Sequence, residues 1–201
     1  MIQAYHFTGD KLRDGSTVPK IGEWLEYDGE IVMCRKGLHA SLHPCDALKY
    51  APGSYLHKVE LSGEIIYSED KIVATRRRII ATIDADDLLR EYARQCAISV
   101  LHLWDAPDVV IRYLRTGDES LRERSMAATR SATRLASGAA IRAAIRAASW
   151  CIPHNIPSLI ASRRASTEAS WAVGITTSSP ENHRRFAAMV WMAFNEAGEG
   201  E

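Results

Sequence analysis

The sequence predicts an α+β protein in which a small mixed or antiparallel β-module comes first and an all-helical region follows. Three observations support this prediction. Up to residue 83, short alternating runs are separated by turns that contain glycine or aspartate. From residue 84 onward, apolar residues recur at helical spacing. Between residues 119 and 150, arginines recur in a four-residue rhythm and alanines fill much of the space between them.

The β-module is predicted to span residues 1–83. Strands are expected where apolar and polar residues alternate, at 5–8, 31–34, 54–62 and 77–83, with 21–27 a weaker candidate. Asp28-Gly29 lies between two of these runs, and this dipeptide favours a tight hairpin turn. Pro44 is expected to begin a short helix that includes residues 46–50, because proline is favourable in the first turn of a helix.

The helical region is predicted to span residues 84–198. Helices are expected over 86–100 and 108–116, over 119–150 as one alanine- and arginine-rich helix, over 158–172, and from Pro180 onward. A break is expected at 151–157, and a loose tail from Gly198. The long helix has alanines that favour close packing, either on the 158–172 helix or on a second subunit: Ala139, Ala140, Ala143, Ala144, Ala147 and Ala148.

Composition indicates an ordinary globular protein, because 46% of its 201 residues are hydrophobic and 25% are charged. The four cysteines are scattered, which is typical of free thiols in a reducing compartment. The first residues lack the basic and apolar runs of a signal peptide. No stretch approaches the ~20 apolar residues of a membrane span. We therefore expect a cytoplasmic protein with no membrane partner.

The net charge of zero hides an asymmetry along the chain. Residues 1–70 contain eleven acidic and seven basic residues, whereas residues 121–167 contain eight arginines and a single acid, Glu123. A basic half of this kind can attract a polyanion. Because aromatic residues are not interleaved with the arginines, however, we expect a solvated helix or a contact with a protein partner or second subunit, rather than nucleic-acid binding.

Two short segments have the composition of a binding site. The first is Gly37-Leu38-His39-Ala40-Ser41, in which glycine allows a turn or a close approach to a ligand and the small residues leave room beside the histidine. The second is His6-Phe7-Thr8-Gly9 in a strand-like run. Histidines and cysteines also gather at 34–45, but their spacing matches no familiar zinc site, and we expect no metal.

Over residues 4–82 these segments resemble the ADP-ribosyltransferase superfamily, which has a His-x-Thr strand and a later Gly-(Ile/Leu)-Tyr motif. The resemblance implies NAD or an ADP-ribose-type nucleotide as the ligand. It implies that His6 contacts the adenosine-side ribose and that His39 replaces the tyrosine that stacks on nicotinamide. It also implies that these two histidines lie on neighbouring strands and face one cleft. The remaining residues of this cleft would be Thr8, Gly37 and Ser41.

The superfamily also places a glutamate on a later strand, and Glu69 occupies the corresponding region in a predicted turn. His39 and Glu69 are therefore the catalytic residues that the resemblance implies. Arg76 and Arg78 are candidates for the pyrophosphate, because guanidinium groups pair well with phosphate oxygens.

A second resemblance is to uncharacterised phage and prophage proteins that have a Cys-x-x-Gly-(Phe/Leu)-His-Ala motif, here Cys34 to Ala40, and an alanine- and arginine-rich helical tail. Two functions follow from these resemblances, and the charge of the helical half leaves open a third, a nucleic-acid-associated protein that uses the arginine-rich helices. The first is an NAD- or ADP-ribose-type nucleotide-binding protein, which would be an ADP-ribosyltransferase if it is active. The alternative is a non-catalytic phage or prophage interaction protein that acts on a host or phage partner through its helical half.

Overall fold

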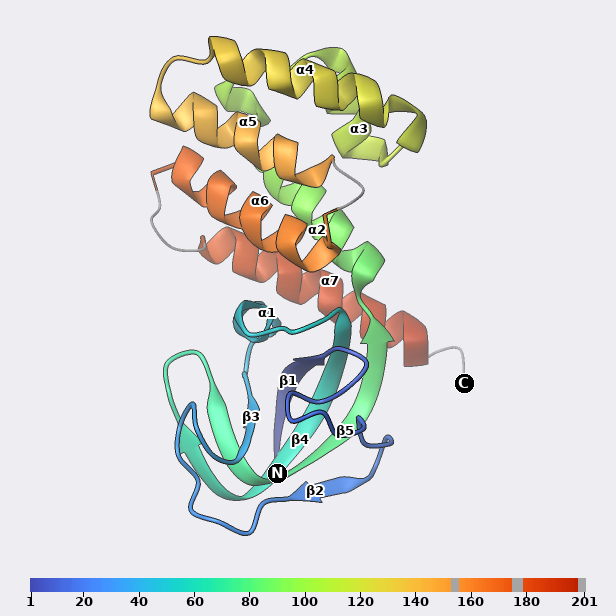
Figure 1. The fold of residues 1–201 in the computed structure, drawn as a ribbon, viewed down its shortest axis with the longest axis vertical. Coiled ribbons are helices and arrows are strands. Elements are labelled where there is room, and N and C mark those ends of the chain that lie inside the picture. Colours follow the sequence, from blue (N-terminus) through green and yellow to red (C-terminus); the bar gives the residue numbers. More distant parts are fainter. Residues whose placement is uncertain (153–155, 175–178, 199–201) are drawn as a thin grey trace. The chain divides into compact units, whose positions relative to one another are not determined.

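The computed structural model describes residues 1–152, 156–174 and 179–198, and it confirms the predicted α+β class (Figure 1). The chain divides into two compact units. The first, the β-rich unit, comprises Met1–Asp86 and the chain from Phe186 onward, and the second, the helical unit, comprises Asp87–Arg185. The prediction assigned all of 84–198 to the helical region, whereas the last helix from Phe186 onward groups with the β-rich unit.

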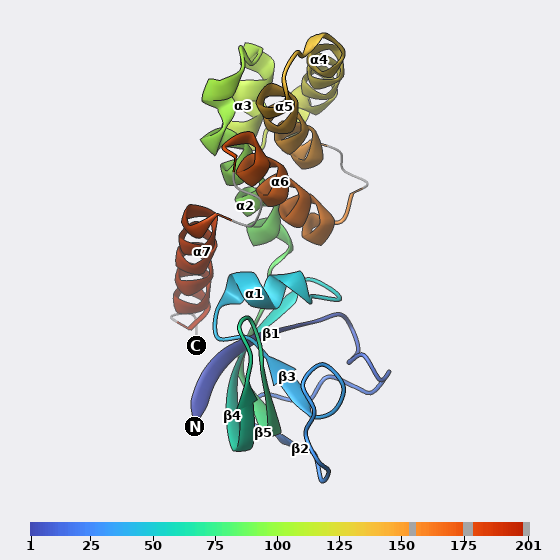
Figure 2. The same cartoon turned by 90° about the vertical axis from the view of Figure 1, so that its left-hand side faces the viewer.

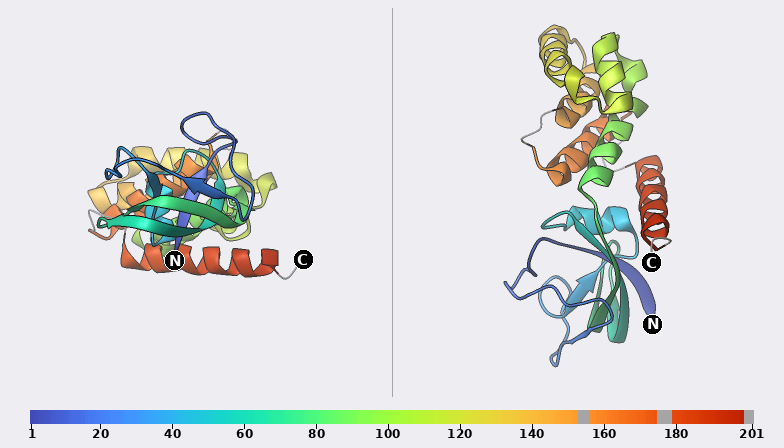
Figure 3. Two further views of the ribbon diagram at one scale, coloured as in Figure 1. Left: turned by 90° about the horizontal axis from the view of Figure 1, so that it is seen from below. Right: turned by 90° about the vertical axis from the view of Figure 1, so that its right-hand side faces the viewer.

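The β-rich unit is built on two long antiparallel strands that form a hairpin and curve strongly (Figures 1 and 3). Shorter strands pair along the two outer edges of this hairpin, in the order β1-β4-β5-β2, with β3 also on β5. The strands and the short helix of this unit are β1 (Ile2–Thr8), β2 (Trp24–Glu26), β3 (Leu38–Ala40), α1 (Pro44–Lys49), β4 (Tyr55–Tyr67) and β5 (Ile72–Asp84).

The sheet closes on itself between β1 and the end of β3. Tyr5 and Ser41 exchange two backbone hydrogen bonds, of 2.8 and 2.9 Å between N and O. Closure creates an interior filled by small and branched apolar side chains from four strands: Ala4, Ala40, Val59, Leu61, Ile72, Ala74 and Ile79. Helix α1 lies beside β1 (Figure 2). A polar residue on the same strand face as these side chains therefore also points into the interior.

Two local predictions for the β-module are wrong. Residues 31–34 form no strand, because the chain turns there and Cys34 adopts a positive φ of 65°. This turn is held by Val32, whose carbonyl oxygen accepts backbone hydrogen bonds from Arg35 and Lys36. Since the residues directly after Asp28-Gly29 form no strand, that dipeptide does not make the predicted hairpin turn. The apolar run of 31–34 instead supplies Ile31, which is buried under the loop.

The helical unit consists of short helices, several of which begin where the sequence predicted. Proline or glycine at the ends of α3 and α6 explains the agreement, since Pro107, Pro157 and Gly117 flank them. The elements are α2 (Asp86–Ser99), η1 (Leu101–Leu103), α3 (Asp108–Thr116), η2 (Glu119–Leu121), α4 (Arg122–Leu135), α5 (Ala139–Cys151) and α6 (Ser158–Ala172), and α7 (Pro180–Gly198) follows.

The single helix predicted over 119–150 is wrong, because the structure has a 3₁₀ turn and two α-helices there. The break lies at Ala136, which is extended, and Gly138, which has a φ of 90°. Glycine is favoured in this left-handed region because it has no Cβ. Of the predicted breaks and tail, residues 153–155, 175–178 and 199–201 lie outside the described residues.

The predicted packing of the alanine-rich helix on the 158–172 helix is confirmed, and α5 and α6 lie side by side (Figures 1 and 2). Ala139 and Ala140 are exposed, but Ala143, Ala144, Ala147 and Ala148 are buried, as are Ala161, Ala165 and Ala169 of α6. Arg146 Nε lies 2.9 Å from Glu168 Oε2 across the same contact. None of the helices in the described ranges is both long and apolar enough to cross a membrane.

Candidate functional site

The interior of the β-rich unit contains a polar cluster centred on His57, which was not among the predicted site residues. His57 Nε2 lies 2.8 Å from Thr8 Oγ1, and His57 Nδ1 lies 2.8 Å from Thr82 Oγ1. A neutral imidazole has one donor and one acceptor, and hydroxyl groups can satisfy both. Burial, followed by the charge of Arg77, lowers the pKa of His57 to about 4. His57 is therefore buried and neutral, and both of its ring nitrogens form hydrogen bonds.

His6 joins this cluster through strand pairing. It lies opposite His57 in the β1–β4 register, and the two ring centroids are 6.5 Å apart. The pKa of His6 lies well below its usual value, mainly because of burial and then because of the charge of Arg77, with smaller effects from His57, Arg13 and His39. The structure thus brings together His6 and Thr8, which were both predicted for the site. The groups that act on His6 are the cations Arg77 and Arg13 and two further histidines, which can be protonated.

Arg77 is the most unusual member of the cluster. It pairs with Leu61 in the β4–β5 register, so it points to the same interior face, and its side chain is only 6% exposed. Its Nη1 donates a hydrogen bond to the carbonyl oxygen of His39. Burial lowers its pKa to about 10, so the group stays charged at neutral pH. Among the described residues, no carboxylate forms an ion pair with this guanidinium.

Strand alternation separates His39 from His6, although the two rings are near enough for their charges to interact. Ala40 lies in the same apolar core as Ala4. Successive side chains of a strand point to opposite faces, so His39 lies on the face opposite Ala40, whereas His6 lies on the face of Ala4. The His39 ring is instead used inside the loop before β3. Its Nδ1–H donates to the carbonyl of Gly37 at 3.1 Å, and its Nε2 accepts from the backbone N–H of Cys34 at 3.0 Å.

Gly37 and Ser41 have structural explanations as well. Gly37 has a φ of 103°, and a Cβ at this position would lie 2.6 Å from Val73 Cγ2 and 2.8 Å from Ile31 Cγ2. The absence of a side chain therefore lets the loop pack on β5. Ser41 is buried, and its backbone closes the sheet against Tyr5. Among the described residues, the Ser41 side chain makes no hydrogen bond to the His57 cluster, and Gly37 has no side chain.

Arg76 and Arg78 lie on the face opposite Arg77 and have acidic partners. Arg76 Nη2 lies 2.9 Å from Glu26 Oε1, and Arg78 Nη2 lies 2.6 Å from Glu60 Oε2. Both guanidinium groups also stack over the Trp24 ring, at 4.7 and 4.8 Å from its centroid. The two arginines predicted for the pyrophosphate are thus engaged with side chains of this unit, and the arginine between them is the one in the interior.

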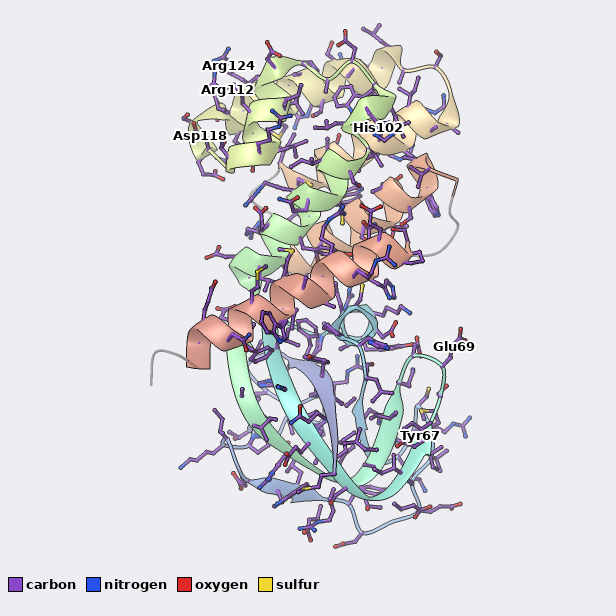
Figure 4. All side chains as sticks on the ribbon, turned by 180° about the vertical axis from the view of Figure 1, so that it is seen from behind. Tyr67, Glu69, His102, Arg112, Asp118 and Arg124 are labelled. Carbon is purple, nitrogen blue, oxygen red and sulfur yellow. The ribbon has the colours of Figure 1, made fainter. Side chains whose placement is uncertain are left out.

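Glu69 lies in the tight turn between β4 and β5, as the sequence indicated, where Ser68 N donates to Lys71 O at 2.8 Å. Its side chain is exposed at the tip of the hairpin (Figure 4). It is not part of the His57 cluster. Within the described part of the chain, no group of three or more His, Cys, Asp or Glu side chains is arranged to hold a metal ion.

Comparison with known proteins finds a family model that matches the N-terminal part of the chain. This model, described as a domain of unknown function (DUF7666), matches residues 2–91, which correspond to the strands, α1 and the first residues of α2. No curated protein and no solved structure matches the chain. The matched segment contains the whole His57 cluster and the loop that holds His39.

Proposed function

We propose that the β-rich unit binds the phosphates of an NAD- or ADP-ribose-type nucleotide at the cluster of Arg77, His6 and Arg13. One observation carries this proposal: the guanidinium of Arg77 is buried and has no carboxylate partner among the described residues. Burying an unpaired charge is unfavourable, and a bound anion would offset that cost. A phosphate also fits the planar fork of an arginine side chain.

The accessible part of the cluster supports the same proposal. Arg13 is exposed and lies near both His6 and His39, and its Nη2 donates to the carbonyl oxygen of Tyr50 at 2.7 Å. His6 retains partial exposure. An anion could therefore contact Arg13 and His6 from solvent, within range of the charge of Arg77, which already lowers the pKa of His6. The resemblance to ADP-ribosyltransferases around His6 and Thr8 is the reason for choosing a nucleotide rather than a simple anion.

The proposal is for binding without transfer. An ADP-ribosyl transfer passes through an oxocarbenium-like state, and the ADP-ribosyltransferase superfamily usually supplies a glutamate that orients the nicotinamide ribose or the acceptor. Glu69 is in an exposed turn away from the cluster, which supports binding rather than turnover. We extend the proposal to a cytoplasmic location, since no disulfide joins any of the four cysteines within the described residues.

The test is a calorimetric titration of the full chain with ADP-ribose, NAD and inorganic pyrophosphate. Arg77→Lys keeps the charge but removes the guanidinium fork. It should weaken binding by about tenfold or more, as expected for a lost hydrogen bond between charged groups. Arg78→Gln is the matched control, because Arg78 lies next in sequence but pairs with Glu60. Wild-type protein that binds none of the three ligands at millimolar concentration, or an equal effect of both variants, would contradict the proposal.

The second candidate function is a non-catalytic interaction protein that acts through the helical unit. The observation that favours it is charge: residues 87–185 contain fourteen arginines, no lysine and nine carboxylates, so their formal net charge is +5. The rest of the chain contains eleven basic and sixteen acidic residues, for a net charge of −5. The positive net charge of residues 87–185 favours binding to an acidic partner.

A further inference from the structure

We infer that the outward face of α4 binds the phosphate backbone of a nucleic-acid duplex without sequence specificity. The inference rests on the second candidate function and is independent of the nucleotide proposal, which concerns the other unit. It is carried by the contrast between four arginines of the helical unit that have carboxylate partners and six exposed arginines that form no ion pair within the described residues. The pKa of Asp118 is lowered by hydrogen bonds from Ser120 and, to a smaller extent, by the charge of Arg112, one of these six.

The arginines of the first group have carboxylate partners. Arg94 pairs with Glu91, Arg122 with Glu119, Arg146 with Glu168 and Arg185 with Glu181. The last two pairs have N–O distances of 2.9 and 3.0 Å, and the Arg146 pair lies at the packed contact of α5 and α6. The positive charge of each of these four arginines is therefore matched by a carboxylate.

The arginines of the second group are exposed and form no ion pair within the described residues: Arg112, Arg115, Arg124, Arg130, Arg134 and Arg142. They belong to α3, α4 and the first turn of α5. Figure 4 shows the side chains of Arg112 and Arg124 extending outward from their helices. Six of the fourteen arginines of the helical unit therefore stand at outward positions without an ion pair.

Three of these arginines share one face of α4. The helix buries Ser125 and Thr129 against its neighbours. At 3.6 residues per turn, Arg124, Arg130 and Arg134 fall within an arc of about 120° opposite that buried side. Arg130 and Arg134 are one turn apart, so they repel each other. Glu123 lies on the same face, but it is seven positions before Arg130 and too far along the helix to pair with it.

The composition of this face favours a duplex backbone over a protein partner. The residues between the arginines are small, Ala127 and Ser131, and the face has no aromatic residue. Leu135, which is 82% exposed, is its one large apolar side chain and stands at the end of the helix. Protein interfaces generally rely on buried aromatic and aliphatic anchors. Single-strand sites rely on aromatic residues that stack on bases. A duplex backbone needs neither, only positive charges.

The alanines of the helical unit support the same assignment. The sequence left open whether the alanine-rich stretch contacts a second subunit. In the structure its buried alanines, Ala143, Ala144, Ala147 and Ala148, pack within the unit, where α5 meets α6. The outward arginines of α4 therefore take no part in the contact between α5 and α6. The absence of interleaved aromatics, which argued against nucleic acid at the sequence level, excludes base stacking but not backbone binding.

The test measures fluorescence anisotropy of a labelled random-sequence DNA duplex, titrated with the full chain at several salt concentrations. Three phosphate contacts predict a slope of log K against log[salt] of about −3. The double variant Arg130→Gln/Arg134→Gln should reduce the magnitude of this slope by about 2. The matched control is Arg35→Gln/Lys36→Gln, which removes two exposed cations from the β-rich unit and should leave the slope unchanged.

Three results would overturn the inference. The first is an absence of duplex binding by the wild-type chain at low salt. The second is an equal change of slope in the two double variants, which would mean that net charge alone is sensed. The third is binding of polyglutamate as tight as that of the duplex and equally sensitive to Arg130→Gln/Arg134→Gln, which would indicate an acidic protein as the partner. Circular dichroism of each variant checks that its helices are retained.

Discussion

Replacing Gly37 with alanine separates a packing role of this glycine from a ligand-binding one. Gly37 has a φ of 103°, which costs an L-residue about 1–2 kcal/mol. The new Cβ would also lie 2.6 Å from Val73 Cγ2 and 2.8 Å from Ile31 Cγ2. Both neighbours are buried, so they cannot move aside freely, and overpacking of this kind costs about 1–3 kcal/mol. Gly37→Ala should therefore destabilise the β-rich unit by about 2–5 kcal/mol.

Gly15→Ala is the matched control. Gly15 has a similar φ of 86°, but no heavy atom lies within 4 Å of its would-be Cβ, so only the conformational cost of about 1–2 kcal/mol applies. Urea unfolding would be followed by NMR signals of β4 and β5, so that the helical unit does not contribute. Equal destabilisation by the two substitutions would contradict the packing argument. A Gly37→Ala protein that is no less stable than Gly15→Ala but loses ADP-ribose binding would restore a ligand role for Gly37.

Two further predictions concern the helical contact and the buried histidine. Ala144→Leu should overpack the contact of α5 with α6 and lower the free energy of unfolding by about 1–3 kcal/mol, whereas Ala140→Leu, at an exposed position of the same helix, should change it little. An unchanged melting temperature for Ala144→Leu would mean that this contact is not formed. His57, with a pKa of about 4, should remain neutral in the folded protein when the pH falls from 7 to 5. The unfolded chain takes up a proton on this residue near pH 6.5, so the corresponding stability is fully present above that pH and is lost as the pH falls toward 4, by about 3 kcal/mol in all. NMR titration of the imidazole signals checks this, and a His57 signal that titrates near pH 6.5 would contradict it.

The sequence predicted local features of the fold well, since helix boundaries are determined by nearby residues. The helices over 108–116 and 158–172 have the predicted bounds, and prolines or glycines mark their ends. The prediction of one long helix was wrong at Gly138. Alanine and arginine on both sides favour helix, so the sequence pattern did not reveal a break at a single glycine. The run 31–34 failed because its apolar residues are buried by a loop rather than by strand pairing.

The candidate site was only partly predictable, because long-range pairing determines which polar residues meet. His6 and Thr8 were identified from their own motif. His57 stands 49 residues from the Thr8 hydroxyl that it contacts, and only the β1–β4 register brings them together. Its alternation with Val59 and Leu61 was visible in the sequence and could have marked His57 as an inward residue. The motif around His39 does not reveal which face of the short β3 strand is interior, so the sequence alone could not place its ring.

The three consecutive arginines on β5 show what strand alternation can decide and what it cannot. Arg76 and Arg78 must share one face, and Arg77 must occupy the other. Which face is interior depends on the pairing of β5 with β4, where Arg77 lies opposite Leu61 of the apolar core. The outer pair is matched by Glu26, Glu60 and the ring of Trp24, so its charges are satisfied by the protein itself. The inner arginine has no carboxylate partner among the described residues, and its Nη1 donates to the carbonyl oxygen of His39. The burial cost of Arg77 is thus the least compensated of the three, and an anion bound beside it would stabilise the fold as well as the complex.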